Sequence, residues 1–297
     1  MAEERKWEGK TDGGNFGQKF LLWALHRVNV CWLYPLLVVA IPFYLLFGRE
    51  GRKASYHYFR DRHQFSFWKS CWYVLKNHIC FGAVVLDKFA LIAGNKGQYK
   101  ALVTNDDIIQ QKLNQPGGFL IAGAHVGNLE MSGLCVPHAQ KRINSIIFGG
   151  ESGDFQKKRI EAFTQSEMNM IPVEEDMSHL FAIKEALEKE EVVVIPCDRV
   201  WGSSKVVSTP FLNGEAEFPV GTFRLAAQLD VPVMVLFIFK EKWNTYRVLS
   251  KELKLTDEYS NSIQKSTTYC KAYVKELETV VREYPEQWFN FYPFWKS

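Results

Sequence analysis

The stretch that decides the fold is "GFLIAGAHVGNLEM", residues 118 to 131. An apolar run over 118–124 is followed within a few residues by a histidine, a glycine, an asparagine and a glutamate. A short apolar run that ends in turn-forming residues predicts a buried β-strand. Asn128 is suited to cap a helix that begins near it. The stretch therefore predicts a strand, a turn at His125 and then a helix.

Similar patterns recur along the rest of the chain. Further strand-like runs lie at 143–148, 168–173, 191–197 and 231–239, and helical patterns lie near 155–166, 178–190, 220–229 and 257–283. Strands that alternate with helices predict an α/β fold with a mixed, largely parallel sheet flanked by helices. Such sheets bind ligands at the carboxyl ends of their strands, which is where His125 is predicted to lie.

The N-terminal part of the chain is apolar and basic. Arg27 and Arg49 bracket 21 uncharged residues, and a helix of that length spans roughly 30 Å, the thickness of a bilayer's hydrocarbon core. We expect a membrane-anchor helix at about 28–48. Pro35 and Pro42 make a kinked or re-entrant anchor an alternative, and a buried core helix is another. Residues 48–92 predict two amphipathic helices on the membrane surface.

Composition and charge exclude several classes of protein. The chain has 297 residues, 47% hydrophobic and 23% charged, which excludes disorder and allows a large core. Its net charge of +3 is too small for a nucleic-acid partner. Residues 1–100 carry 15 Lys and Arg against 7 Asp and Glu, which favours an anionic surface such as lipid headgroups. The six cysteines lie far apart without metal-ligand spacing, so we expect free thiols and no metal.

His125 and Glu130 form a candidate catalytic pair. Because five residues turn an α-helix by about 140° beyond one full turn, the two side chains can meet only around a corner. There Glu130 would fix the imidazole tautomer and leave the other ring nitrogen as a base. Gly127 gives the turn conformational freedom and lets a large group approach the backbone. The alternative is a plain strand-to-helix corner without catalytic function.

The sequence contains no serine or cysteine nucleophile with a known signature. The stretch "GGESGD" is not a nucleophile elbow, because its glycine spacing is different. A histidine base without a protein nucleophile implies that the attacking group belongs to the substrate. That chemistry suits direct transfer to a hydroxyl or an amine.

Four blocks of the sequence resemble those of a known family. "AHVGNLEM" resembles the H-x-x-x-x-D/E signature of the lysophospholipid acyltransferase superfamily, in the "HxGNxE" form of its lipid A biosynthesis (lauroyl/myristoyl) branch. "DRVWGSS" (198–204), "FLNGEAEFPVGTFRLAAQLDVPVMVLFIF" (211–239) and "YPEQWFNFYPFW" (284–295) resemble later blocks of that branch in the expected order. The resemblance covers nearly the whole chain.

The resemblance implies an acyltransferase with a glycerol-phosphate acyltransferase-like fold. A fatty acyl group would pass from acyl-ACP (acyl carrier protein) or acyl-CoA to a hydroxyl or amine of a lipid A-like, glycolipid or aminolipid acceptor. His125 would be the general base and Glu130 its orienting carboxylate, with no bound cofactor. The domain would cover 55–297, behind an N-terminal segment at 1–54, on the cytoplasmic face of a bacterial inner membrane.

The resemblance also suggests substrate-binding residues. Gly127 and Asn128 lie within the motif, and Arg159 matches an arginine that many relatives carry, although an exposed helical charge is an equal alternative. Asp198 and Arg199 stand where many relatives have Asp-Gln. Gly221 lies where glycerolipid relatives have "FPEGT", but Val220 replaces the glutamate, which disfavours a simple glycerophospholipid acceptor.

Two other functions remain open on the sequence alone. A lipid hydrolase or thioesterase would use the same base to activate water. A non-catalytic lipid-binding membrane protein would have the His125 turn only as a structural corner. The aromatic tail, 284–295, suits either a headgroup layer or a packed core.

Overall fold

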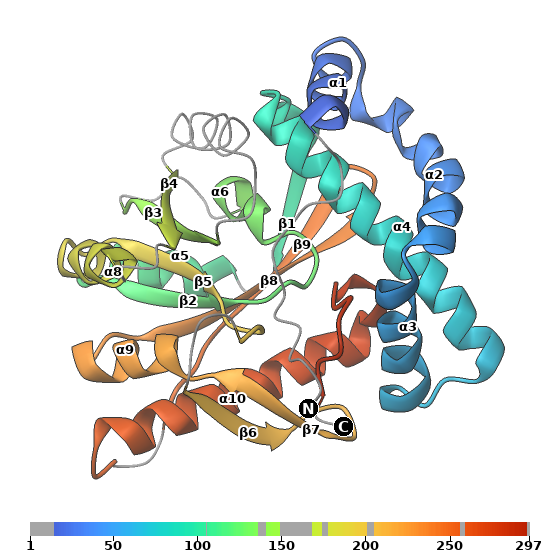
Figure 1. Ribbon diagram of the computed structural model, residues 1–297. Helices are drawn as coiled ribbons and strands as arrows, with labels where there is room; N and C mark the ends of the chain where they lie inside the picture. The colour runs from blue at the N-terminus through green and yellow to red at the C-terminus, as the bar shows by residue number, and fades with distance from the viewer. Residues whose placement is uncertain are drawn as a thin grey trace.

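The computed structural model describes residues 15–104, 106–135, 141–148, 168–173, 178–200, 205–255 and 259–295. Its centre is a seven-stranded sheet (Figure 1). The strand order is β1 (Lys100–Thr104), β9 (Thr245–Glu252), β8 (Val233–Lys242), β2 (Phe119–Gly123), β5 (Val192–Pro196), β3 (Ile143–Phe148), β4 (Met168–Val173). Only the β8–β9 pair is antiparallel. The predicted mixed, largely parallel sheet is confirmed.

Helices cover both faces of this sheet. Leu120 and Ala122 of β2 face a core shared with α8 (Ser178–Glu188), α9 (Gly221–Leu229) and α10 (Ser262–Glu283). Phe119 and Ile121 face the other core, which α5 (Asp106–Asn114) covers. Every residue of β2 is buried, as expected for a central parallel strand. This burial is why the strand reads as an unbroken apolar run.

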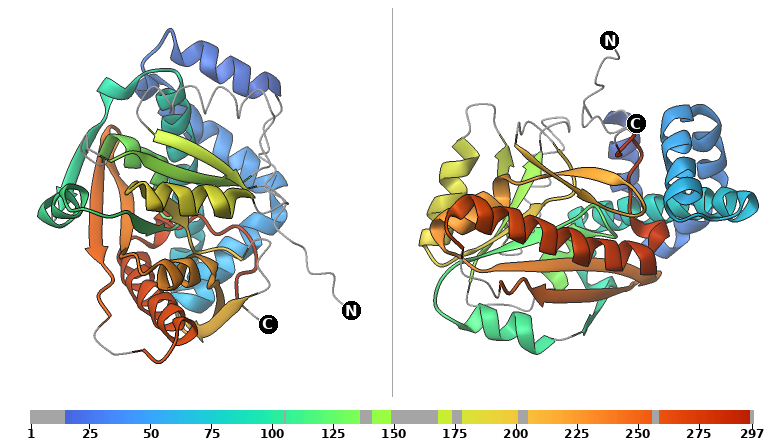
Figure 2. Two further views of the ribbon diagram at one scale, coloured as in Figure 1. Left: turned by 90° about the vertical axis from the view of Figure 1, so that its left-hand side faces the viewer. Right: turned by 90° about the horizontal axis from the view of Figure 1, so that it is seen from below.

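The N-terminal helices pack against α4 (Phe67–Ile92) (Figures 1 and 2). They are α1 (Asn15–Leu25), the 3-10 turn η1 (Val30–Trp32), α2 (Tyr34–Phe47), α3 (Arg49–His57) and the π-helix η2 (Tyr58–Arg62). The two amphipathic helices predicted for 48–92 are present as α3 and α4.

The uncharged run 28–48 does not form the single helix that we expected. The Asn29 side chain accepts a hydrogen bond from the Cys31 backbone N–H and starts η1, and α2 begins afresh at Tyr34 with Pro35 in its first turn. None of the helices in the described part of the chain has both the length and the apolar composition to cross a bilayer.

Several elements lie where the sequence predicts none. They are β1, β9, α5 and the separate antiparallel pair β6 (Val206–Pro210) and β7 (Glu215–Pro219). The predicted helix at 155–166 lies outside the described residues. After α10, the 3-10 turn η5 (Pro285–Gln287) leads the C-terminal segment back along the carboxyl edge of β2.

Candidate active site

The site is built where the carboxyl ends of β2 and β5 meet. These strands are parallel and in register, with Gly123 opposite Pro196. His125 and Asp198 each follow their strand by two residues, so the register places them opposite each other. His125 Nδ1 lies 2.7 Å from Asp198 Oδ1, and the His125 backbone N–H donates to Asp198 Oδ2 at 3.0 Å.

A third donor completes the surroundings of Asp198. The indole N–H of Trp288, in the C-terminal segment, donates to Asp198 Oδ2 at 3.0 Å. The Asp198 side chain is 1% exposed, whereas the imidazole keeps 29% of its surface exposed. The carboxylate is therefore enclosed, and the histidine that it orients is accessible.

The acceptor for Nδ1 is Asp198. The sequence had predicted Glu130 as this acceptor, and that prediction is wrong. Glu130 lies in the 3-10 turn η4 (Leu129–Met131), and its carboxylate pairs with Lys88 of α4 at 3.1 Å. The prediction failed because η4 follows His125 so closely that residue 130 faces α4, while the edge of β5 supplies a carboxylate directly. A part for Glu130 in catalysis stays a prediction.

Protonation in the pair follows from its surroundings. Burial alone would raise the pKa of Asp198, but the charges of His125 and Arg199 and the hydrogen bonds to the carboxylate outweigh it, so the pKa lies well below its ordinary value. Burial, followed by the Arg199 charge, lowers the pKa of His125, against the opposing effect of Asp198 and Glu130. An ionised Asp198 can only accept, so neutral His125 carries its proton on Nδ1. The other nitrogen, Nε2, is then the basic one.

Arg199 lies beside the pair. Its Nη2 donates to the Phe289 carbonyl at 2.7 Å, and its guanidinium lies 5.7 Å from the centre of the Tyr292 ring. The arrangement places a fixed positive charge close to the basic histidine. A contact between Arg199 and the substrate stays a prediction.

Gly127 and Asn128 hold the turn against the sheet. Gly127 has a φ of +59°, and a Cβ there would lie 1.9 Å from the Ile238 carbonyl oxygen of β8. The group that approaches this glycine is therefore the protein's own backbone. Asn128 is 3% exposed, its backbone N–H donates to the Ile238 carbonyl, and its side chain reaches Tyr246 inside the core. It occupies the cap position of η4 without a capping hydrogen bond from its side chain.

The family model of the bacterial lipid A biosynthesis acyltransferases matches residues 80–297. The chain belongs to this family. The structure of this acyltransferase is also similar to the crystal structure of the 1-acyl-sn-glycerophosphate (LPA) acyltransferase, PlsC, from Thermotoga maritima. That match has 12% sequence identity and a TM-score of 0.35, and covers 89% of this chain and 98% of that chain. No curated protein matches the sequence significantly.

The remaining predicted residues of this acyltransferase lie as follows. Gly221 is the exposed first residue of α9, and nothing lies within 4 Å of a Cβ built on it. Its neighbour Thr222 lies close to the side chain of Cys197, which precedes Asp198, so the start of α9 lies near the pair. Arg159 lies outside the described residues.

Trp288 is the site residue that sequence reasoning missed. It belongs to the block 284–295, for which membrane contact and core packing were the two expectations. Trp288 is 1% exposed and packs among Tyr58, Phe211, Phe294 and Trp295, so the core expectation is confirmed at this position. The signal available in the sequence was an indole within a block that resembles a family signature.

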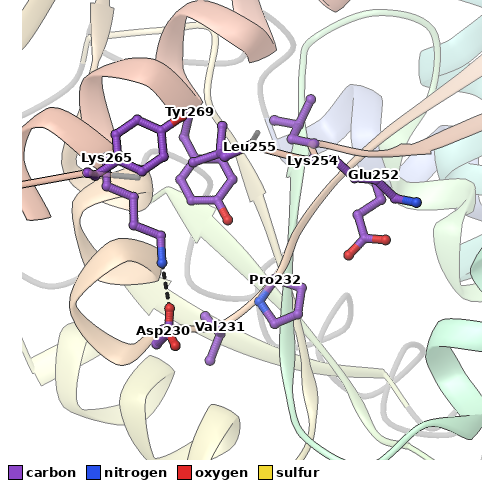
Figure 3. A pocket seen from close by; sticks show the side chains of 10 residues that line it. Asp230, Val231, Pro232, Glu252, Lys254, Leu255, Lys265 and Tyr269 are labelled. Carbon is purple, nitrogen blue, oxygen red and sulfur yellow. Dashed lines mark hydrogen bonds and ion pairs between the residues drawn. The ribbon is translucent and has the colours of Figure 1, made fainter. Parts of the chain in front are cut away.

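A surface hollow of about 550 Å³ lies away from this site (Figure 3). It is lined by residues that precede β8, including Asp230, and by residues that follow β9, including Lys254. Because β8 runs parallel to β2, the start of β8 lies at the sheet edge opposite His125. An ion pair between Lys265 and Asp230 crosses the hollow. We assign it no part in acyl transfer.

Proposed function

We propose that this acyltransferase moves a fatty acyl chain from acyl-ACP or acyl-CoA to a hydroxyl or amine of a lipid, with His125 as general base. The observation that carries the proposal is the His125–Asp198 hydrogen bond at the carboxyl edge of two neighbouring parallel strands. The buried carboxylate orients the imidazole and stabilises the imidazolium that forms, as the acid does in a catalytic triad. Lipid A-like, glycolipid and aminolipid acceptors all fit this chemistry.

The proposed reaction needs no covalent enzyme intermediate. His125 Nε2 takes the proton of the acceptor as its oxygen or nitrogen attacks the thioester carbonyl. The tetrahedral intermediate then breaks its carbon–sulfur bond, and the imidazolium returns the proton to the leaving thiolate. The Arg199 guanidinium can stabilise the negative charge on the former carbonyl oxygen.

Cys197, next to Asp198 in the sequence, is unsuited to be a nucleophile. Its thiol is 1% exposed and bonds the Ile195 carbonyl, and burial raises its pKa far above that of a free cysteine. This supports direct transfer between the two substrates. We expect no metal or bound cofactor, and a domain boundary near residue 54, as the sequence predicts.

His125→Ala tests the proposal directly. The variant should lose at least about 100-fold in acyl transfer while its thermal unfolding stays close to wild type. Transfer that survives in His125→Ala would refute the base. Release of free fatty acid by the wild-type enzyme, at the transfer rate and without any acceptor, would favour the thioesterase alternative instead.

We further propose that the N-terminal helices dock on the membrane that holds the acceptor. Large apolar side chains, each at least 60% exposed, cover η1 and α2: Trp32, Leu36, Val38, Val39, Phe43, Leu46 and Phe47. Exposed apolar surface of this extent marks a contact with lipid or protein. Basic residues of α3, including Arg49 and Lys53, adjoin α2 and favour anionic headgroups.

The membrane proposal has its own test. The double variant Val39→Asp and Phe43→Asp should lose cosedimentation with phosphatidylethanolamine/phosphatidylglycerol vesicles. Phe181→Asp is the matched control, because Phe181 is 76% exposed but lies on α8. Equal vesicle binding by all three proteins would refute docking through α2. Lipid mass spectrometry of cells that lack or overproduce the enzyme would identify the acceptor by the species that gains one acyl chain.

A further inference from the structure

The C-terminal segment Gln287–Phe289 runs alongside the catalytic turn. The Phe289 backbone N–H donates to the His125 carbonyl at 3.0 Å, and the Gln287 carbonyl accepts from the Gly127 N–H at 2.8 Å. Between these bonds, Trp288 forms an antiparallel bridge with Val126. The segment therefore pairs with the turn as a short strand would.

Both neighbours of the base are also bound by this segment. The Trp288 indole N–H donates to Asp198, and the Phe289 carbonyl accepts from Arg199. One three-residue segment thus fixes the backbone of the base, its orienting carboxylate and the adjacent guanidinium. Packing alone would not require an indole nitrogen to point at that carboxylate.

We infer that Trp288 is a positioning residue for the reaction, whose indole N–H fixes Asp198 in the rotamer that holds His125. The inference rests on the proposed function, in which His125 is the base. Asp198 Oδ2 is held by two N–H donors, from His125 and Trp288, so Oδ1 is left to face Nδ1. Without the indole donor, Oδ2 keeps only the bond from the His125 backbone N–H, so the carboxylate still faces His125 but is held less rigidly.

The segment itself is anchored from three other elements. Asn77 of α4 donates its side-chain N–H groups to the carbonyls of Glu286 and Trp288. The Gln287 side chain exchanges two hydrogen bonds with the Lys240 backbone of β8, and the Tyr58 hydroxyl of the π-helix donates to the Pro285 carbonyl. Trp288 is therefore held in place independently of Asp198, as a positioning residue must be.

The indole bond also affects the proton affinity of the base. A donated hydrogen bond neutralises part of the charge on Asp198, and that charge raises the pKa of His125. Loss of the bond should therefore raise the pKa of His125. The other ionisable groups that act on the pair among the described residues are Arg199, Glu130, Cys197, Tyr273 and Tyr292, and the test leaves them unchanged.

Trp288→Phe removes the donor and keeps an aromatic ring. We expect kcat to fall about 10-fold to 100-fold, because a small misplacement of a catalytic group has effects of that size. The acid limb of the kcat/KM profile should move up by about 0.5 pH unit. Trp295→Phe is the matched control: its indole N–H donates to the Phe211 carbonyl in the same aromatic cluster. The control should keep the wild-type acid limb.

A measurement on the wild-type protein covers the case in which Trp288→Phe does not fold. With ¹⁵N-labelled tryptophan, one indole N–H resonance should titrate with the midpoint of the acid limb, and this titration should vanish in His125→Ala. An acid limb in Trp288→Phe equal to that of Trp295→Phe, or indole resonances that do not titrate, would overturn the inference. Either result leaves the base assignment standing if His125→Ala is inactive, whereas an active His125→Ala refutes the proposed function itself.

Discussion

Asp198→Asn and Glu130→Gln separate the two carboxylates that could serve His125. In Asp198→Asn, the N–H groups of His125 and Trp288 still need an acceptor, so the amide oxygen keeps their side of the residue. The amide NH2 then faces His125 Nδ1 and donates to it. The imidazole is forced to carry its proton on Nε2, and the base that should receive the substrate proton is lost.

The size of this effect follows from the role of the base. General-base catalysis contributes about 10²–10⁴ in rate, so kcat/KM for Asp198→Asn should fall by about that factor, or about 3–5 kcal/mol in activation free energy. Glu130→Gln keeps its shape and acts on His125 only through charge, so we expect a loss below about 10-fold. Its acid limb should move to lower pH, because the Glu130 charge raises the pKa of His125.

The assay is acyl transfer from one thioester donor between pH 5 and 8, with each rate corrected for folded protein by near-UV circular dichroism. The wild-type rate should rise through a midpoint below the ordinary histidine pKa of 6.5, because burial and Arg199 lower the pKa of His125. If Glu130→Gln lost as much activity as Asp198→Asn, the assignment of the orienting carboxylate to Asp198 would be wrong.

Three further predictions concern stability. Gly127→Ala should lower the free energy of unfolding in urea by about 2 kcal/mol or more, because residue 127 has a positive φ and the Ile238 backbone lies against it. Gly221→Ala should leave that free energy unchanged or raise it, because a methyl group at the start of α9 meets open space. Burial, with two nearby cations, lowers the pKa of His63 to about 4, so wild type should lose about 3 kcal/mol as pH falls from 6.5 to 4, and His63→Phe should lose much less over that interval. Asp87→Asn should lower the free energy of unfolding in urea by about 3–5 kcal/mol, because it leaves the Lys240 ammonium buried without a counter-charge. Lys240→Met should lower it less, because three tyrosine hydroxyls still donate to Asp87.

The sequence predicted the central strands of the sheet well and its periphery poorly. Strands β2, β5 and β8 are buried on both faces and therefore read as continuous apolar runs. Edge strand β1 and the β6–β7 pair mix polar and apolar residues, and their identity as strands depends on partners far away in the chain. The apolar run 28–48 predicted one long helix from composition, whereas the Asn29 side chain set a local break.

The candidate site shows the same division between local and non-local information. That His125 and Asp198 each follow a strand was readable from the sequence. That β2 pairs with β5 in register was not, because 73 residues separate the partners. The motif spacing instead drew attention to Glu130, which is close along the chain but directed toward α4.

Helix α4 contacts both of the segments that flank His125, the turn that holds Glu130 and the segment that holds Trp288. Lys88 pairs with Glu130 on one side of His125, and Asn77 binds the carbonyl of Trp288 on the other. These two α4 residues are eleven apart, which is close to three helical turns, so they lie on the same face. The helix thus bridges the two segments that flank the base, and its N-terminal turns expose Trp68 and Trp72.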